Sequence, residues 1–180
     1  ILVYLELALV PVKIVTRQTS DRIQAAIDLE QRVPAKSVHT TIVRNEEYSP
    51  YFILCLLNSR LLDYLYRILT AETGRTFAQV KLYDLRRLPI PKMQFREGDE
   101  ARRSSFERAV DAIEASHFEE VNTWTQEHIV QGYKDTVHDI LSYLAKRNIT
   151  LHGEQQRIID DFWTDLEGVT APAAFRKLRD

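Results

Sequence analysis

Glycine, cysteine and long apolar runs are scarce in this sequence, and each shortage excludes a class of protein. With five glycines in 180 residues, the chain has no glycine-rich loop of the kind that cradles nucleotide phosphates. Its one cysteine, Cys55, cannot form a disulfide within the chain, which favours a cytoplasmic setting. The apolar residues 1–10 are interrupted by Glu6, so they are too short for a membrane span and do not form a signal peptide.

Side chains that catalyse reactions or bind metals are also sparse. His117, His128 and His138 are eleven and ten residues apart, so they do not form the i, i+4 pair that presents two imidazoles to one metal ion. The acidic pair Asp160 and Asp161 is interpreted as the solvated edge of a helix. We therefore expect no catalytic residue, no metal site and no bound cofactor in this chain.

The charge of the chain is distributed unevenly. The formal net charge of −2 would by itself argue against a nucleic-acid partner. Residues 1–92, however, contain 13 Lys and Arg against 9 Asp and Glu, whereas residues 93–180 contain 11 against 17. The first part is therefore basic and the second acidic. With 44% hydrophobic residues, the chain can bury the core of one domain or of two small ones.

Short stretches rich in β-branched residues predict strands in the first half. Residues 12–16 and 36–44 are of this kind. Residues 23–29 alternate between apolar and polar side chains, which favours a strand, although Ser20 and Asp21 could also begin a helix there. Residues 1–10 fit a strand or a helix equally well. We expect a small mixed sheet.

Residues 49–91 form the stretch around which we expect the chain to be organised. Ser49 and Pro50 are typical of a helix start, and the helix that follows is apolar on all sides. Asn58 can end it in the left-handed conformation, and Ser59 can cap a second helix. Residues 71–80 then form a loop, and prolines keep residues 88–91 extended. The second helix is expected to bury Leu61, Leu62, Leu65, Ile68 and Leu69.

The second half is expected to be helical throughout. Polar residues 94–100 predict a domain boundary, which gives domains 1–93 and 94–180 and an α+β fold with an all-α C-terminal region. A first apolar stripe reaches Trp124, with a helix restart at Thr123, and a second stripe ends near Asn148. These two helices are expected to pair antiparallel. A third helix follows over residues 158–166 and is closed by Gly168, and a short last helix covers residues 170–178.

Two polar clusters in the first half are candidates for contacts with nucleic acid. Arg can bind guanine and Gln can bind adenine in the major groove, while Thr and Lys suit phosphates. Any one of these residues could equally be ordinary surface charge, but a small-residue, charged loop before a proline-fixed exit favours function. His39 could also face a phosphate. The candidate DNA-binding residues are Arg17, Thr19, Arg22, Thr73, Arg75, Thr76, Gln79 and Lys81.

Three runs of sequence resemble a known family. The runs are residues 13–17 (KIVTR), 56–64 (LLNSRLLDY) and 88–91 (LPIP). Together they are similar to the TaqI-like C-terminal specificity domain, over about half of the chain. This resemblance implies sequence-specific recognition of double-stranded DNA for adenine-N6 methyltransferases and single-chain restriction–modification enzymes. Residues 141–163 resemble the helical tail that follows such domains.

The catalytic part of such an enzyme is not expected here. An adenine-N6 methyltransferase holds its flipped base with an Asn/Asp-Pro-Pro-aromatic loop, and this sequence contains no Pro-Pro. The resemblance therefore implies a partner, the methyltransferase catalytic domain of the same parent chain, which would bind S-adenosylmethionine. Two alternatives stay open: a protein-interaction module that docks a partner through its acidic helices, and an independent enzyme.

Overall fold

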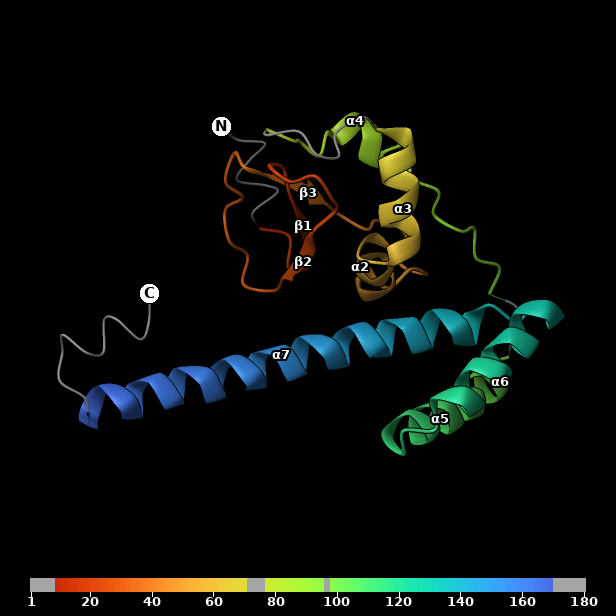
Figure 1. Cartoon of the computed structure of the whole chain (residues 1–180). Coiled ribbons are helices and arrows are strands. Elements are labelled where there is room, and N and C mark those ends of the chain that lie inside the picture. The colour runs from red at the N-terminus through yellow and green to blue at the C-terminus, as the bar shows by residue number, and fades with distance from the viewer. Residues whose placement is uncertain (1–8, 71–76, 96–97, 170–180) are drawn as a thin grey trace. The chain divides into compact units, whose positions relative to one another are not determined.

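The computed structural model describes residues 9–70, 77–95 and 98–169 (Figure 1). By its internal contacts the chain divides into two compact units, Ile1–Ala145 and Lys146–Asp180. This division does not fall at the polar residues 94–100, where a domain boundary is expected from the sequence. The helices that directly follow those residues belong to the same compact unit as the sheet.

A three-stranded antiparallel sheet forms the N-terminal part of the first unit. Its strands are β1 (Lys13–Arg17), β2 (Ala25–Asp28) and β3 (Val38–Thr41), in the order β2-β1-β3. The register pairs Ile14 with Ile27 and with Thr41. All three predicted strands are present, which confirms the α+β class. In the part of the chain that the structure describes, the sheet is antiparallel rather than mixed.

Two short helices follow the sheet, and their predicted caps are confirmed. The helices are α2 (Pro50–Leu57) and α3 (Arg60–Leu69). Ser49 Oγ accepts a hydrogen bond from the Tyr51 amide, and Ser59 Oγ accepts one from the Leu62 amide, each at 3.2 Å. Each hydroxyl thereby satisfies an N–H group that has no partner within its helix.

Asn58 has a different role from the one predicted. Its φ of −89° is not left-handed, so α2 does not end through the conformation that asparagine tolerates best. Its side chain instead pairs with the backbone of β2. Asn58 Oδ1 accepts from the Ala25 amide at 3.0 Å, and Asn58 Nδ2 donates to the Ala25 carbonyl at 2.9 Å. The Asn58 side chain therefore makes the same pair of hydrogen bonds to Ala25 that the backbone of a neighbouring strand would make.

The buried side of α3 also differs from the prediction. Leu62 and Tyr66 are buried, whereas Leu61 and Ile68 are exposed. The predicted buried stripe of α3 does not include Tyr66, although this residue lies four positions after Leu62 and so on the same face of the helix.

The main core lies between the sheet, α2, α3 and the segment that leads into α4 (Leu82–Leu85). Figure 1 shows how these elements are arranged. Aliphatic side chains dominate it, and their burial is the main stabilising contribution to this part of the fold. Its buried members are Ile14, Ile23, Phe52, Ile53, Leu54, Leu57, Tyr66, Val80 and Leu88.

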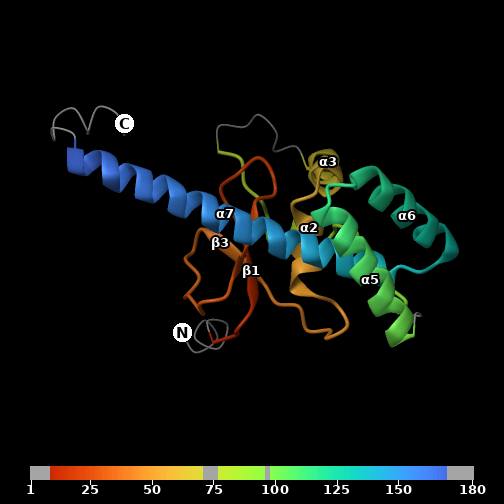
Figure 2. The same cartoon turned by 90° about the horizontal axis from the view of Figure 1, so that it is seen from below.

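The remaining described elements are three helices, α5 (Asp99–Glu114), α6 (Phe118–Gln131) and α7 (Asp135–Val169). The predicted restart at Thr123 is wrong, since the break comes earlier, at Ser116, which has φ 62°. A second break falls at Gly132, whose φ of 86° is the left-handed conformation that glycine adopts without strain. Instead of one antiparallel pair, α5 lies beside α6 (Figure 2) and also packs on the start of α7.

Helix α7 is a single continuous element. The predicted end at Asn148 is wrong, because the helix passes through it, whereas the described part of the helix ends at Val169, one residue after Gly168. Asparagine disfavours a helix interior only weakly, so it does not stop a helix without further breaking residues. The helix predicted for residues 170–178 lies outside the described residues, as do residues 1–8 and 71–76.

A polar and aromatic junction ties the start of α7 to the start of α2. The Ser49 amide donates to His138 Nε2 at 3.0 Å, so His138 holds its proton on Nδ1 and donates to Asp139 Oδ1 at 2.9 Å. The His138 ring packs on Phe52, with ring centroids 4.6 Å apart. Arg102 of α5 donates two hydrogen bonds to Asp139, at 2.6 and 2.7 Å.

This junction also controls the acidity of Asp139. Burial alone would raise the pKa of the Asp139 carboxyl, but the hydrogen bonds from His138 and Arg102, together with the Arg102 charge, lower that pKa below its usual value. The ionised carboxylate is therefore the stable form at neutral pH, and it holds α5 and α7 together.

Candidate nucleic-acid interface

The structure brings Gln79 and Lys81 of the second predicted polar cluster next to the first cluster, although the two are far apart in sequence. The Val80 amide donates to the Gln18 carbonyl at 2.7 Å, which joins the segment after α3 to the turn between β1 and β2. The side chains on both sides of this bond are exposed. They are Arg17, Thr19 and Arg22 from the turn, and Gln79 and Lys81 from the segment.

Three of the predicted site residues lie outside the described residues. These are Thr73, Arg75 and Thr76. Their contribution to DNA binding stays a prediction.

The segment around Val80 is held from three directions. Besides the bond to Gln18, the Val80 carbonyl accepts from His39 Nε2 at 2.7 Å, and the Gln79 carbonyl accepts from the Tyr66 hydroxyl at 3.2 Å. Val80 itself is fully buried. The segment is thus fixed to the turn after β1, to β3 and to α3, so the exposed side chains of Gln79 and Lys81 start from a rigid backbone.

His39 was predicted as a possible phosphate ligand, and this interpretation is corrected. A carbonyl can only accept, so the Nε2 atom of His39 carries a hydrogen and is used to bind Val80. The residue positions the candidate site from inside. Sequence reasoning could not find this role, since the two partners are 41 positions apart.

Helix α4 places further basic and aromatic side chains directly after Lys81. Tyr83, Arg86 and Arg87 are exposed, and the Arg87 guanidinium lies 5.4 Å from the centre of the Tyr83 ring. Arg87 also lies 3.6 Å from the carboxylate of Asp84. Arginine held against an aromatic ring is a common way to present a planar cation to a nucleic acid.

The lysine of the KIVTR run is structural. Lys13 Nζ lies 2.7 Å from Asp28 Oδ2, both side chains are buried, and the two residues are directly opposite each other in the β1–β2 register. The hydrogen bond from Lys13 outweighs the effect of burial and lowers the pKa of Asp28, which also accepts from the amides of Glu30 and Arg32. This ion pair fixes the register of the strands that carry the first polar cluster.

A cavity of about 370 Å³ lies on the core side of the sheet, next to α2 and α4. Most of its lining is aliphatic, for example Ile53 and Leu85. The buried Thr16 hydroxyl at its wall has no hydrogen-bond partner. Its lining contains no carboxylate and no imidazole, so it lacks the groups that acid–base catalysis would use.

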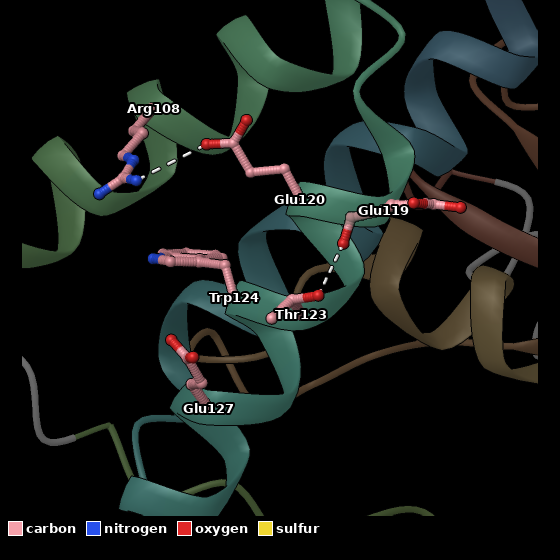
Figure 3. Close-up of a pocket in the computed structure, with 6 residues that line it drawn as sticks. All are labelled: Arg108, Glu119, Glu120, Thr123, Trp124 and Glu127. Atoms are coloured by element: carbon pink, nitrogen blue, oxygen red, sulfur yellow. Dashed lines mark hydrogen bonds and ion pairs between the residues drawn. The ribbon is translucent and has the colours of Figure 1, made fainter.

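A second hollow, of about 360 Å³, lies on α5 and α6 and is shown in Figure 3. The Trp124 ring projects from α6 between Glu120 and Glu127, and Arg108 reaches across from α5 to Glu120, with 3.6 Å between the charged atoms. Glu119 adds a third carboxylate to the lining. With three carboxylates and one guanidinium, the lining of this hollow carries a net negative charge.

Neither a metal centre nor a membrane span is found in the described residues. No group of three or more His, Cys, Asp or Glu side chains within residues 9–70, 77–95 and 98–169 could hold a metal ion. Across the same residues, no helix is both long and apolar enough to cross a membrane. Cys55 is half-buried, and burial raises the pKa of its thiol, so it is a poor nucleophile.

Comparison with known families identifies the first half of the chain. Residues 4–90 match the model of the TaqI-like C-terminal specificity domain, the family that the sequence motifs predicted. The matched region contains the sheet, α2 to α4 and both polar clusters. This match suggests a DNA-specificity role in the context of methyltransferases and restriction–modification. No curated protein and no solved structure was found to match the chain.

Proposed function

We propose that residues 1–93 recognise a specific double-stranded DNA sequence for a DNA adenine-N6 methyltransferase or a single-chain restriction–modification enzyme. The chain supplies the specificity, and the chemistry takes place in a catalytic domain of the same parent protein, with S-adenosylmethionine as the methyl donor. The absence of an Asn/Asp-Pro-Pro-aromatic loop from the sequence supports this division of roles. The purified chain is expected to transfer no methyl group to DNA.

One observation carries this proposal: the hydrogen bond between Val80 and Gln18. It joins two exposed polar clusters inside the region that matches a specificity family. Base recognition needs donors and acceptors mounted on a rigid backbone, because a misplaced side chain loses the bidentate geometry that distinguishes bases. The contacts from His39 and Tyr66 supply that rigidity.

The two exposed residues of the fixed segment should have separate roles. Gln79 has an amide that can pair with an adenine edge, whereas Lys81 offers a point charge that suits a phosphate. Gln79→Ala should reduce discrimination between cognate and scrambled duplexes by about 1–3 kcal/mol. Lys81→Ala should weaken binding to both duplexes alike, and should reduce the salt dependence by about one unit of log K per log salt.

The experiment titrates fluorescently labelled duplexes at several salt concentrations. The cognate duplex is first selected from a random pool with the unmodified chain. Arg103→Ala is a matched control, because Arg103 is an exposed arginine of α5 outside the proposed interface. If Gln79→Ala and Lys81→Ala both bind like Arg103→Ala, the fixed segment is not the DNA-binding surface.

A second candidate function is docking of a protein partner through the acidic hollow on α5 and α6. The carboxylates of Glu120 and Glu127 beside Trp124, with Glu119 also in the lining, favour it. Glu119→Lys together with Glu127→Lys should then weaken co-purification with the parent's catalytic domain and leave DNA affinity unchanged. An unchanged yield of the co-purified catalytic domain would exclude this surface.

A further inference from the structure

Residues 77–81 alternate strictly between exposed and buried. Phe77 is 83% exposed and Ala78 only 6%, Gln79 is exposed, Val80 is fully buried, and Lys81 is exposed again. Alternation at period two is the pattern of an extended chain that packs one face on a core. Phe77, Gln79 and Lys81 therefore share the outward face.

An aromatic side chain on this outward face calls for an explanation. Phe77 is 83% exposed and so gains little from burial within the fold, while Ala78 and Val80 anchor the backbone on either side of Gln79. Single exposed apolar residues are common on protein surfaces. This one, however, stands in line with the amide of Gln79 and the ammonium group of Lys81, the two groups assigned above to a base edge and a phosphate.

Extended backbone would give the outward side chains a spacing that fits the spacing of bases. In an extended chain, every second residue advances by about 6.6–6.8 Å. Successive bases on one DNA strand are about 3.4 Å apart, so this advance matches two base steps. In the major groove, the apolar group that a phenylalanine can contact is the 5-methyl group of thymine.

We infer that Phe77 is a specificity-determining residue that contacts the 5-methyl group of a thymine in the major groove, near the base pair bound by Gln79. This inference rests on the proposed function. The Phe77 side chain adds an apolar contact to the polar contacts of Gln79 and Lys81. At one position of the site it increases the affinity for thymine over bases that lack the 5-methyl group, cytosine and uracil, beyond the difference that hydrogen bonds alone would give.

The test removes only the methyl group. Each thymine of the selected cognate duplex is replaced in turn by uracil, which keeps the base pair and all of its hydrogen bonds. The unmodified chain should bind one of these duplexes about fourfold more weakly, the effect of losing one buried methyl group. Phe77→Ala should bind the thymine and uracil forms of that duplex equally well. Phe118→Ala, which removes an exposed aromatic ring at the start of α6, outside the proposed interface, should keep the fourfold preference.

The possible outcomes separate this inference from the proposed function. If the chain selects no preferred duplex, the proposed function itself fails. If it selects a duplex but no uracil substitution has an effect that depends on Phe77, or if the selected site contains no A·T pair, only the thymine contact is overturned. Strong 2-aminopurine fluorescence that depends on Phe77 would also overturn it, since this would show insertion between bases instead of contact along the groove.

Discussion

The pairing of Asn58 with Ala25 yields the most direct test of how the helices are mounted on the sheet. Asn58→Ala removes two hydrogen bonds, one in each direction, between the end of α2 and the backbone of β2. An intramolecular hydrogen bond contributes about 0.5–1.5 kcal/mol net, so the pair contributes about 1–3 kcal/mol. Because both bonds are exposed to solvent, we expect a loss in the lower half of that range, about 1–2 kcal/mol.

Urea denaturation followed by far-UV circular dichroism measures this loss, and exchange of the Ala25 amide measures it locally. That amide should exchange faster in Asn58→Ala, because it has lost its acceptor. Asn58→Asp should be no better, since the carboxylate cannot donate to the Ala25 carbonyl. Asn148→Ala, at an exposed asparagine of α7, is the control and should change stability by less than about 0.5 kcal/mol. An Asn58→Ala chain with unchanged stability and an equally protected Ala25 amide would refute the reasoning.

Two further predictions concern the helical part of the first unit. Arg102→Ala should cost about 1.5–3 kcal/mol of stability at pH 7, as expected for charge-assisted hydrogen bonds, while Arg103→Ala at an exposed pair should cost little. The pKa of Asp139 is lower in the folded state than in the unfolded state. The stability lost in Arg102→Ala should therefore be largest above the unfolded pKa, near 4, and should disappear as the pH falls through the folded pKa. Urea titrations at several pH values would measure this pH dependence. Ile113→Asp should cost on the order of 3–5 kcal/mol, because it leaves an unpaired charge in the core shared by α5 and α7, whereas Val130→Asp at an exposed site should leave the thermal melting curve unchanged.

Features that depend on neighbouring residues could be predicted from the sequence. Ser49 and Ser59 cap helices because their hydroxyls reach amides two or three residues ahead, whatever the rest of the chain does. The three strands were predicted for the same reason, since β-branched and alternating residues favour extended chain locally. The break at Ser116 was missed, because a serine with φ 62° leaves no warning in the pattern.

In the candidate site, too, the residue types could be predicted from the sequence, but their arrangement in space could not. Its residue types, Arg and Thr in one turn and Gln and Lys in another segment, could be selected from the sequence because the chemistry of base and phosphate recognition requires them. That the two clusters meet could not be predicted, because this depends on the bond between Gln18 and Val80, which joins segments distant in sequence.

What the sequence by itself determined is therefore the set of local elements, their caps, the resemblance to a specificity domain and the candidate polar residues. The tertiary structure alone decided which of these become neighbours. His39 and Asn58 show the physical reason: each uses a side chain to bind a backbone 41 or 33 positions away. A backbone group is present at every residue, so no sequence pattern marks which one will be the partner until the chain is packed.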